Sequence, residues 1–385
     1  MRKWTRATAV MMLCIFIATG ASAESFGSGD VTPPEVWGSG SSSDSSWGNN
    51  SSGGSSSEND FFGGSSSGNS SGSSSSKGSS PAVEPEMIVN IPADVVNKDI
   101  IIETPRYEIT ATYTLPEGEG PFPLVIMSHG FLGGRNQRGG FAAIAVELAH
   151  QGIASIRMDF AGCGDSTADF QLNNLTGMAS DVIACREWAI NNLPVDKDAI
   201  CLLGYSLGSL VSLCATLHMP DICNAMVLLA PAGMVDIRSL YYSQYQEALK
   251  DGYYTTVSYG KSYNVSTSWY EDLFSLEILL KTYNARANVF MVYGTRDTLL
   301  SVETALQCAE KLQAKKLEID GAYHSLGLSG TMPAIFEQVK SGVVEYITGI
   351  FAPEISDFGA FGEETAEEET KAQTVQGSGT IHFGN

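Results

Sequence analysis

The chain has 385 residues, 43 acidic against 22 basic side chains, a formal net charge of -21 and a hydrophobic fraction of 43%. It is too apolar to be wholly disordered and long enough for one large domain or two small ones. The acidic balance argues against a nucleic-acid partner, because such binding depends on Lys and Arg side chains that neutralise phosphates. We therefore expect a folded protein that does not bind nucleic acid.

Residues 1–23 contain the three parts of a secretory signal peptide. Basic side chains lie among the first six residues, an apolar run follows from Ala9 to Ala18, and Ala21-Ser22-Ala23 is a small-residue cleavage site. The apolar run is too short for a membrane-spanning helix, which needs about 20 residues. The sequence predicts a secreted, extracellular protein whose mature chain starts at Glu24.

Two segments of biased composition flank the part that can fold. Residues 24–80 are rich in Ser and Gly, which predicts a disordered linker that tethers the folded part, for instance to a cell surface or a larger assembly. Residues 352–385 include the run Glu363-Glu364-Thr365-Ala366-Glu367-Glu368-Glu369 and are predicted to be a disordered acidic tail. The folded domain is therefore expected at 81–351.

Within that domain, apolar strand patterns alternate with amphipathic helix patterns. In chain order we expect one or two strands in 100–115, a strand at 124–127, a helix at 141–151, a strand at 153–158, a helix at 178–193, a strand at 200–203, a helix at 206–218 and a strand at 225–229. After an insertion at about 232–288 come a strand at 289–293, a helix at 302–313, a strand at 317–319 and a helix at 333–351. This alternation predicts an α/β fold, with a mostly parallel sheet and helices on both faces.

The segment Gly204-Tyr205-Ser206-Leu207-Gly208 lies between a predicted strand and a predicted helix. A nucleophile at such an elbow sits on a strained turn, so the residues two positions away must be small enough to let strand and helix pass closely. The bare pattern is weak, because Gly164-Asp165-Ser166-Thr167-Ala168 nearly matches it. A helix N-cap is the other interpretation of Ser206. The strand–turn–helix context favours Ser206 as a nucleophile.

A catalytic serine needs a base, and on this kind of elbow the partners follow in the order Ser, acid, His. Of the five histidines, His129 precedes the serine on another loop, His150 and His218 lie on predicted helices, and His382 lies in the tail. His324 alone follows a late strand, so we expect it to be the base. The alternative is an ordinary histidine of a surface loop.

The acid should follow a strand between the serine and the histidine, where it can orient the imidazole. Asp297 comes directly after the predicted strand 289–293. Asp320 is the alternative, but it shares the loop of His324 and is explained as a turn former. The sequence therefore favours Asp297.

Stabilising an oxyanion takes two backbone N–H donors, one after the nucleophile and one in the loop after an early strand. These positions correspond to Leu207 and to Phe131, the latter within Ser128-His129-Gly130-Phe131-Leu132-Gly133-Gly134. The glycine-rich loop could otherwise be a simple turn.

These motifs, in this order and spacing, resemble the α/β-hydrolase superfamily over nearly all of 100–351, and more closely the bacterial feruloyl and cinnamoyl esterases. The loop His129-Gly130-Phe131, its continuation Gly133-Gly134-Arg135-Asn136-Gln137-Arg138, and the segment Asp159-Phe160-Ala161-Gly162-Cys163-Gly164-Asp165-Ser166 carry the closer resemblance. By matching position, it implies catalytic roles for Ser206, Asp297 and His324 and oxyanion roles for Phe131 and Leu207. The sequence departs from those esterases at Tyr205 and Leu207, where they often have His and Gln.

The resemblance implies a secreted serine esterase acting on hydroxycinnamate (feruloyl) esters of plant cell-wall polysaccharide or oligosaccharide. An acyl peptidase and a general short-chain esterase or lipase are alternatives within the same superfamily. A non-catalytic binding module that kept the fold is an alternative of a different class.

The insertion at 232–288 lies where this superfamily places a lid, and we call it the lid. It holds nine of the fifteen tyrosines. Tyrosine offers a flat apolar face with a hydroxyl, which suits a planar phenolic acyl group. The candidate substrate-binding residues are Tyr259, Tyr263, Trp269 and Tyr270. The alternative is that these aromatic residues only pack the lid onto the body.

Six cysteines remain after the predicted signal peptide, an even number that permits disulfides in an exported chain without revealing their pairing. None has the spacing of a zinc site, and Gly162-x-Gly164 lacks the third glycine of a dinucleotide-binding motif. We expect neither a metal nor a cofactor.

Overall fold

A computed structural model describes residues 86–231, 237–258, 260–280 and 283–351. The predicted signal peptide, linker and acidic tail lie outside these residues. All described residues belong to one compact unit, which the division of the chain places within Asn59–Asn385. Among them, no helix combines the length and the apolar character needed to cross a membrane.

An eight-stranded sheet forms the centre of the fold, with the strand order β1-β2-β4-β3-β5-β6-β9-β10. The pairs β1–β2 and β2–β4 are antiparallel, and the other five neighbouring pairs are parallel. The strands are β1 (Val96–Glu103), β2 (Glu108–Leu115), β3 (Phe122–Ser128), β4 (Ala154–Met158), β5 (Val195–Tyr205), β6 (Ala225–Leu229), β9 (Asn288–Gly294) and β10 (Lys315–Ile319).

The central strands are continuous apolar runs because helices cover both faces of the sheet. Every residue of β6 is buried, as are all those of β3 from Leu124 onward. β4 is also fully buried although it contains Arg157. The opening segment expected at 100–115 forms two strands, the first of which starts earlier, at Val96.

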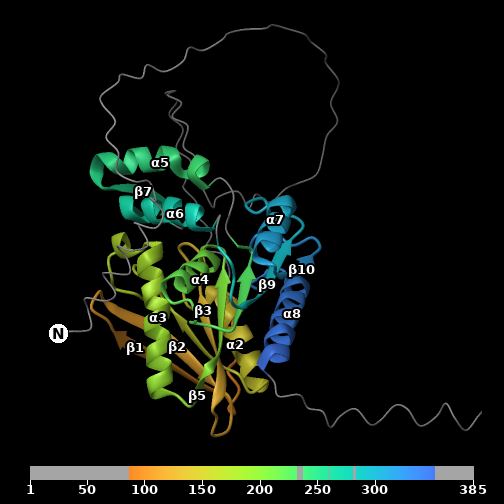
Figure 1. Cartoon of the computed structure of the whole chain (residues 1–385). Helices are drawn as coiled ribbons and strands as arrows, with labels where there is room; N and C mark the ends of the chain where they lie inside the picture. The colour runs from red at the N-terminus through yellow and green to blue at the C-terminus, as the bar shows by residue number, and fades with distance from the viewer. Residues whose placement is uncertain (1–85, 232–236, 259, 281–282, 352–385) are drawn as a thin grey trace, which may run out of the picture. The chain divides into compact units, whose positions relative to one another are not determined.

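Two groups of helices pack on opposite faces of the sheet (Figure 1). Buried residues of α2 (Gly140–His150) and α8 (Pro333–Phe351) share one core, and those of α3 (Leu175–Asn192), α4 (Leu207–His218) and α7 (Val302–Leu312) share the other. Short 3₁₀ turns occur at Gln137–Gly139 and Phe170–Leu172. α3 begins three residues before the expected start, because the side chain of Asn174 caps it by accepting a hydrogen bond from the Gly177 N–H at 2.8 Å. The predicted α/β architecture is confirmed.

The lid contains two helices and a hairpin between β6 and β9: α5 (Ile237–Asp251), β7 (Tyr253–Ser258), β8 (Lys261–Ser266) and α6 (Thr267–Leu280). Figure 1 shows them above the body of the domain. Two hydrogen bonds tie the start of α6 to the start of α3, from Asn174 Nδ2 to Ser268 Oγ (3.2 Å) and from the Thr176 N–H to Asp272 Oδ2 (2.8 Å). The lid is therefore attached to the body by specific polar contacts.

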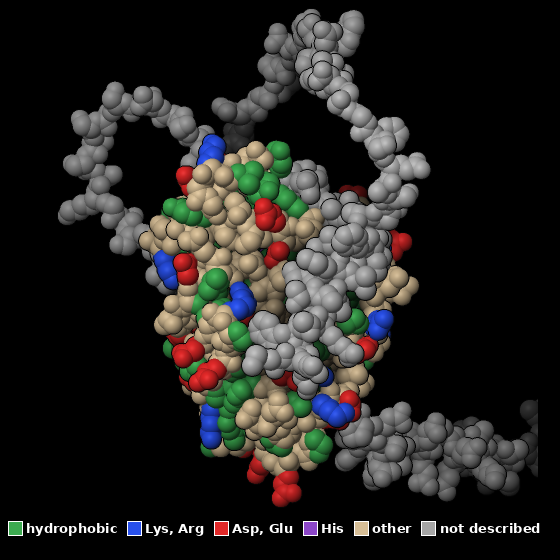
Figure 2. Space-filling model, turned by 60° about the vertical axis from the view of Figure 1, so that its left-hand side comes forward, with side chains coloured by type: hydrophobic (Ala, Val, Ile, Leu, Met, Phe, Trp, Pro, Cys, Tyr) green, Lys and Arg blue, Asp and Glu red, His purple; other side chains and the backbone are tan. Residues whose placement is uncertain are grey.

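Apolar side chains remain exposed on the outer side of the lid. Tyr242 and Leu249 of α5 and Val257 of β7 are each at least half exposed. In the space-filling view, hydrophobic side chains gather over the upper part of the molecule, where Figure 1 places the lid (Figure 2).

The turn from β5 into α4 depends on two glycines. A Cβ atom at Gly204 would overlap with the carbonyl of Gly208, and a Cβ atom at Gly208 would overlap with the carbonyl of Ser128 at the end of β3. All of these obstacles are backbone atoms, which cannot move aside as a side chain can. The start of α4 can therefore pass this close to β3 and β5 only with glycine at both positions.

We predict that Gly208→Ala destabilises the fold by several kcal/mol, because the added methyl group overpacks a backbone crossing. Gly349→Ala is the matched control, since a Cβ at Gly349 meets nothing within 4 Å and this residue lies inside α8. The midpoints of thermal unfolding should fall strongly for the first variant and stay constant or rise for the second. Equal midpoints would contradict the steric argument.

A polar cluster joins the β1–β2 turn to α3. The carboxyl group of Asp181, which is 2% exposed, accepts hydrogen bonds from the Tyr107 hydroxyl and from Arg106 Nη1, the latter at 3.1 Å. Burial raises the pKa of Asp181 to about 7, against the smaller opposing effects of Tyr107 and Arg106. The folded protein therefore holds a proton on Asp181 at pH values where the unfolded chain, with an ordinary carboxyl pKa of about 3.9, has lost it.

From this raised pKa we predict that Asp181 contributes stability at pH 4 that is lost as the pH rises toward 7, by about 1.4 kcal/mol per pH unit. Asp181→Asn stays neutral and should remove this slope. Urea unfolding of both proteins at pH 4.5, 5.5 and 6.5 measures the difference between their free energies of unfolding. Asp221→Asn is the control, because Asp221 is 87% exposed in its ion pair with Arg286. A pH-independent difference for Asp181→Asn would show that this carboxyl group ionises normally.

Candidate active site

Three side chains from the ends of different strands form one chain of hydrogen bonds. Nδ1 of His324 lies 2.8 Å from Oδ2 of Asp297, and Nε2 of His324 lies 2.9 Å from Oγ of Ser206. The side chain of His324 is 13% exposed and that of Asp297 is fully buried. The structure thus brings together the three residues that the sequence singled out for nucleophile, base and acid. Such an arrangement can pass the hydroxyl proton of Ser206 to the imidazole.

Ser206 lies directly after β5, at the turn that the two glycines allow. Its backbone has φ 51° and ψ -117°, a conformation that is rare for a residue with a side chain. Ser206 occupies the N-cap position of α4, yet its side chain makes no capping hydrogen bond. Its hydroxyl contacts His324 instead, so the alternative interpretation as a helix cap does not describe what this side chain does.

The acid is held by backbone N–H groups of its own loop. Oδ1 of Asp297 accepts hydrogen bonds from the N–H groups of Leu299 and Leu300, both at 2.8 Å, which leaves Oδ2 to His324. Asp320 accepts a hydrogen bond from the Thr295 hydroxyl at 3.0 Å. Asp297, rather than Asp320, therefore contacts the histidine.

The loop after β3 is fixed by buried side chains. Nδ1 of His129 lies 2.7 Å from the Gly130 carbonyl, and its Nε2 accepts a hydrogen bond from the Phe160 N–H at 3.1 Å. Since one nitrogen faces an acceptor and the other a donor, the imidazole is neutral with its proton on Nδ1. Burial lowers the pKa of His129, which favours this neutral form. Oε1 of Gln137 accepts a hydrogen bond from the Gly130 N–H at 3.1 Å.

This role of His129 was not found from the sequence, which only excluded it as the base. The available signal was its place in the His-Gly-Phe motif, directly before Gly130. A Cβ atom at Gly130 would lie 3.5 Å from the Cβ of Ser206, so the loop that His129 holds passes beside the nucleophile.

The two N–H groups predicted to bind an oxyanion belong to Leu207, which follows Ser206, and to Phe131 in the loop after β3. Leu207 is the first residue of α4, where backbone N–H groups have no partner within the helix. Phe131 follows Gly130, where a Cβ atom would lie 3.5 Å from the Cβ of Ser206. Among the described residues, no acceptor receives a hydrogen bond from either N–H group. Both donors remain available to a bound carbonyl oxygen.

The side chain of Phe131 packs against one aromatic ring of the lid and one of the body. Its ring centroid lies 5.5 Å from that of Trp269 and 6.2 Å from that of Phe170, and Phe170 in turn lies 5.0 Å from Tyr263. Trp269 and Tyr270 pack at 5.0 Å and are only 4% and 1% exposed. Their burial agrees with the packing alternative for these two residues.

Of the other candidate substrate-binding residues, Tyr263 stays partly exposed, whereas Tyr259 lies outside the described residues. The sequence could not distinguish them, because the contacts of Phe131 and Phe170 with the lid join distant parts of the chain.

The six cysteines outside the predicted signal peptide are free thiols, and all but Cys223 are buried; they are Cys163, Cys185, Cys201, Cys214, Cys223 and Cys308. Burial raises the pKa of five of these thiols: Cys163, Cys185, Cys201, Cys214 and Cys223. In the part of the chain that the structure describes, no group of three or more His, Cys, Asp and Glu side chains is arranged to hold a metal ion.

Residues 120–259 match the sequence model of the serine aminopeptidase S33 family. Over 100 residues the chain is 33% identical to an uncharacterised 31.7 kDa protein encoded between traX and finO in Escherichia coli, and over 147 residues it is 26% identical to an uncharacterised protein of Mycobacterium tuberculosis. The two matches cover 26% and 38% of this chain and 34% and 50% of those proteins. This chain therefore matches half or less of the length of each relative.

Several solved structures are similar over nearly their whole length. They include Est1E from Butyrivibrio proteoclasticus with ferulic acid bound (TM-score 0.50, 19% identity, 64% of this chain and 99% of that one) and a putative hydrolase from Agrobacterium vitis S4 (TM-score 0.53, 18% identity, 66% and 99%). A third is a monoacylglycerol lipase from Paleococcus ferrophilus (TM-score 0.50, 18% identity, 63% and 98%). At these identities the similarity concerns the fold alone. Together with the sheet order and the strand–turn–helix elbow, it shows that this chain has the α/β-hydrolase fold.

Proposed function

We propose that this protein is a serine carboxylesterase that works through an acyl-enzyme on Ser206. The observation that carries the proposal is the continuous hydrogen-bond chain from Asp297 through His324 to Ser206, at an elbow that sets the serine in a strained conformation. A helix cap or a surface histidine would not require this combination. A non-catalytic binding module has no need of it either.

The contacts support one sequence of steps. Oγ of Ser206 attacks the ester carbonyl carbon while Nε2 of His324 takes the hydroxyl proton, and Asp297 stabilises the resulting imidazolium. The N–H groups of Phe131 and Leu207 donate to the oxyanion. His324 then protonates the departing alcohol. A water molecule, deprotonated by His324, attacks the acyl group, the acid leaves, and the Ser206 hydroxyl is restored.

The proposed substrates are hydroxycinnamate (feruloyl) esters of plant cell-wall polysaccharide, and the proposed location is extracellular. Support comes from the aromatic residues around Phe131, from the motifs shared with feruloyl esterases and from the predicted signal peptide. Est1E, which has the same fold and binds ferulic acid, makes ferulate the natural first substrate to test. In this proposal the N-terminal segment tethers the enzyme near its polymeric substrate.

A peptidase acting on acylated or short peptides is the second candidate, because the family model that matches residues 120–259 is that of a serine aminopeptidase. Amide bonds use the same nucleophile and oxyanion donors as esters do. Faster turnover of aminoacyl p-nitroanilides than of any ester would favour this candidate.

We expect the mature protein to hydrolyse methyl ferulate with a higher kcat/KM than methyl octanoate, and Ser206→Ala to abolish both activities and labelling by a fluorophosphonate. Equal or better turnover of the octanoate would retain the serine mechanism but remove the plant-wall assignment. Unlabelled wild-type protein would exclude a reactive serine.

One prediction distinguishes the two aspartates. Asp297→Asn should lower kcat by about four orders of magnitude, since the imidazole loses its orienting carboxylate. Asp320→Asn is the matched control in the neighbouring loop and should keep kcat within about twofold, because surface changes away from the reacting atoms have small effects. The reverse ranking would assign the acid to Asp320.

Another prediction concerns the aromatic residues of the lid. Tyr263 is partly exposed beside Phe170, so Tyr263→Leu should lower the ratio of kcat/KM for methyl ferulate to that for methyl octanoate. Tyr242→Leu, on the exposed side of α5, is the control and should leave the ratio unchanged. If both variants keep the wild-type ratio, the acyl group binds elsewhere.

A further inference from the structure

A second buried carboxylate lies beside the loop that carries Phe131, and the proposed reaction does not use it. Asp159 directly follows β4 and is fully buried. Its Oδ1 accepts a hydrogen bond from the Arg135 N–H at 2.6 Å. Its Oδ2 accepts one from Arg135 Nη1 and one from the Asp165 N–H at 3.0 Å. This carboxylate therefore joins the loop after β3 to the loop after β4.

Glycines let both loops close around this carboxylate. A Cβ atom at Gly164 would overlap with the carboxylate of Asp159, and one at Gly134 would lie 3.3 Å from Asp159 Oδ1. Gly164 also has a φ of 52°, a conformation that glycine adopts without strain. The arrangement therefore needs glycine at 164, and it leaves little room beside Gly134.

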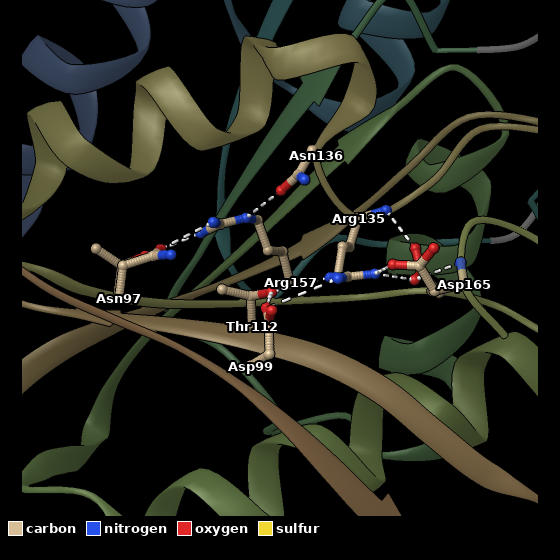
Figure 3. Close-up of polar contacts among 9 residues, drawn as sticks. Asn97, Asp99, Thr112, Arg135, Asn136, Arg157 and Asp165 are labelled. Carbon is tan, nitrogen blue, oxygen red and sulfur yellow. Dashed lines mark hydrogen bonds and ion pairs between the residues drawn. The ribbon is translucent and has the colours of Figure 1, made fainter. Parts of the chain in front are cut away.

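The same loop is held at its end by a buried arginine. Arg157, 2% exposed in β4, donates from Nε to Asn136 Oδ1 at 3.1 Å. Its other nitrogens bond Thr114 Oγ1 at 2.8 Å and Asn97 Oδ1 at 2.9 Å. Figure 3 shows Arg157 and Arg135 side by side, with Asn97 and Asn136 around the first and Thr112, Asp99 and Asp165 around the second. The guanidinium of Arg157 thus fixes Asn136, just before the 3₁₀ turn Gln137–Gly139 that leads into α2.

These contacts divide the loop into short spans. His129 fixes its start through the Phe160 N–H, and the consecutive residues Arg135 and Asn136 fix its later part through Asp159 and Arg157. Phe131 lies between the first two attachments. The Gly133 N–H, which donates to the Gly130 carbonyl at 3.0 Å, closes a turn around Phe131, and the attachments at His129 and Arg135 fix the position of this turn.

We propose that Asp159 is a positioning residue for the oxyanion hole. By fixing the backbone at Arg135, its carboxylate keeps the N–H group of Phe131 directed at the carbonyl oxygen of the substrate. This inference rests on the proposed function, and it extends the site to a residue that contacts neither the substrate nor the triad.

Asp159→Asn is the sharpest perturbation. The amide keeps one acceptor oxygen but replaces the other with an N–H₂ donor, which then faces N–H donors of the protein. The loop must shift to relieve this conflict. Removing an oxyanion donor costs about 100- to 1,000-fold in kcat, so a misdirected donor should cost about 10- to 100-fold. KM should stay within twofold, because the effect arises mainly in the transition state.

The test combines kinetics with a transition-state analogue. We would measure kcat, KM and the pH profile on methyl ferulate, and the inhibition constant of phenylboronic acid, which forms a tetrahedral adduct with a catalytic serine. For Asp159→Asn we expect kcat to fall and the boronate inhibition constant to rise by similar factors. The apparent pKa of kcat/KM should not change, since His324 and Asp297 keep their contacts.

Two controls separate positioning from general destabilisation. Asp165→Asn alters a 73% exposed carboxylate that contacts the same Arg135 nitrogen at 2.7 Å, and it should keep kcat within twofold. Ile347→Ala empties part of the core at α8, away from the polar contacts described above, and should lower the unfolding midpoint without the boronate effect. If Asp159→Asn does not fold, Arg135→Lys carries the test. This variant keeps the backbone hydrogen bond to Asp159 but loses the guanidinium contact with Asp159 Oδ2. We therefore expect kcat and boronate affinity to fall together, by a smaller factor than in Asp159→Asn.

Unchanged kcat in Asp159→Asn, a loss that appears only in KM, or intact boronate affinity would overturn the positioning role. So would an equal loss of kcat in Ile347→Ala at the same unfolding midpoint. A wild-type protein that neither hydrolyses esters nor binds the boronate would instead contradict the proposed function, and this inference with it. The two failures are therefore distinguishable.

Discussion

The close passage of α4 beside the ends of β3 and β5 is the constraint on which the rest of the site depends. Gly204 and Gly208 allow it because any side chain there would overlap with backbone atoms. The passage forces the turn that puts Ser206 at a positive φ, and it starts the helix at Leu207, whose N–H group has no helical partner. The positions of the proposed nucleophile and of one proposed oxyanion donor are thus consequences of one backbone crossing.

Two buried carboxylates at the carboxyl ends of strands have matching roles in this arrangement. Asp297 follows β9 and Asp159 follows β4, and each accepts two backbone N–H hydrogen bonds from nearby loops. Such bonds stabilise a charge that burial would otherwise disfavour. Each carboxylate then has one further contact, Asp297 to an imidazole and Asp159 to a guanidinium. In the proposed mechanism, the first contact orients the base His324, and the second fixes the loop that bears the oxyanion donor Phe131.

The sequence predicts the sheet and the meeting of Ser206, Asp297 and His324, because parallel strands bring their carboxyl ends to one edge. The sequence does not reveal the buried polar contacts that hold the loops at that edge of the sheet. The sequence excludes His129 as the base but does not show that it supports the loop after β3. Arg157 is a charged residue within the otherwise apolar β4, which signals a buried polar contact but does not identify its partners. Nor does the sequence separate the buried Trp269 and Tyr270 from the partly exposed Tyr263, since Trp269 packs against Phe131 and Tyr263 against Phe170, partners that lie over 90 positions away in the chain.

Phe131 links the lid to the proposed chemistry, because its backbone N–H group belongs to the proposed site while its side chain contacts the lid. Its N–H group is the proposed oxyanion donor, while its ring packs against Trp269 of α6 and Phe170. A displacement of α6 therefore changes the packing of a residue whose backbone direction matters for the reaction. The attachments at His129 and Arg135 oppose such a change from the body side. The direction of this N–H group thus depends on two sets of contacts, the polar attachments of its loop and the aromatic contacts of its ring.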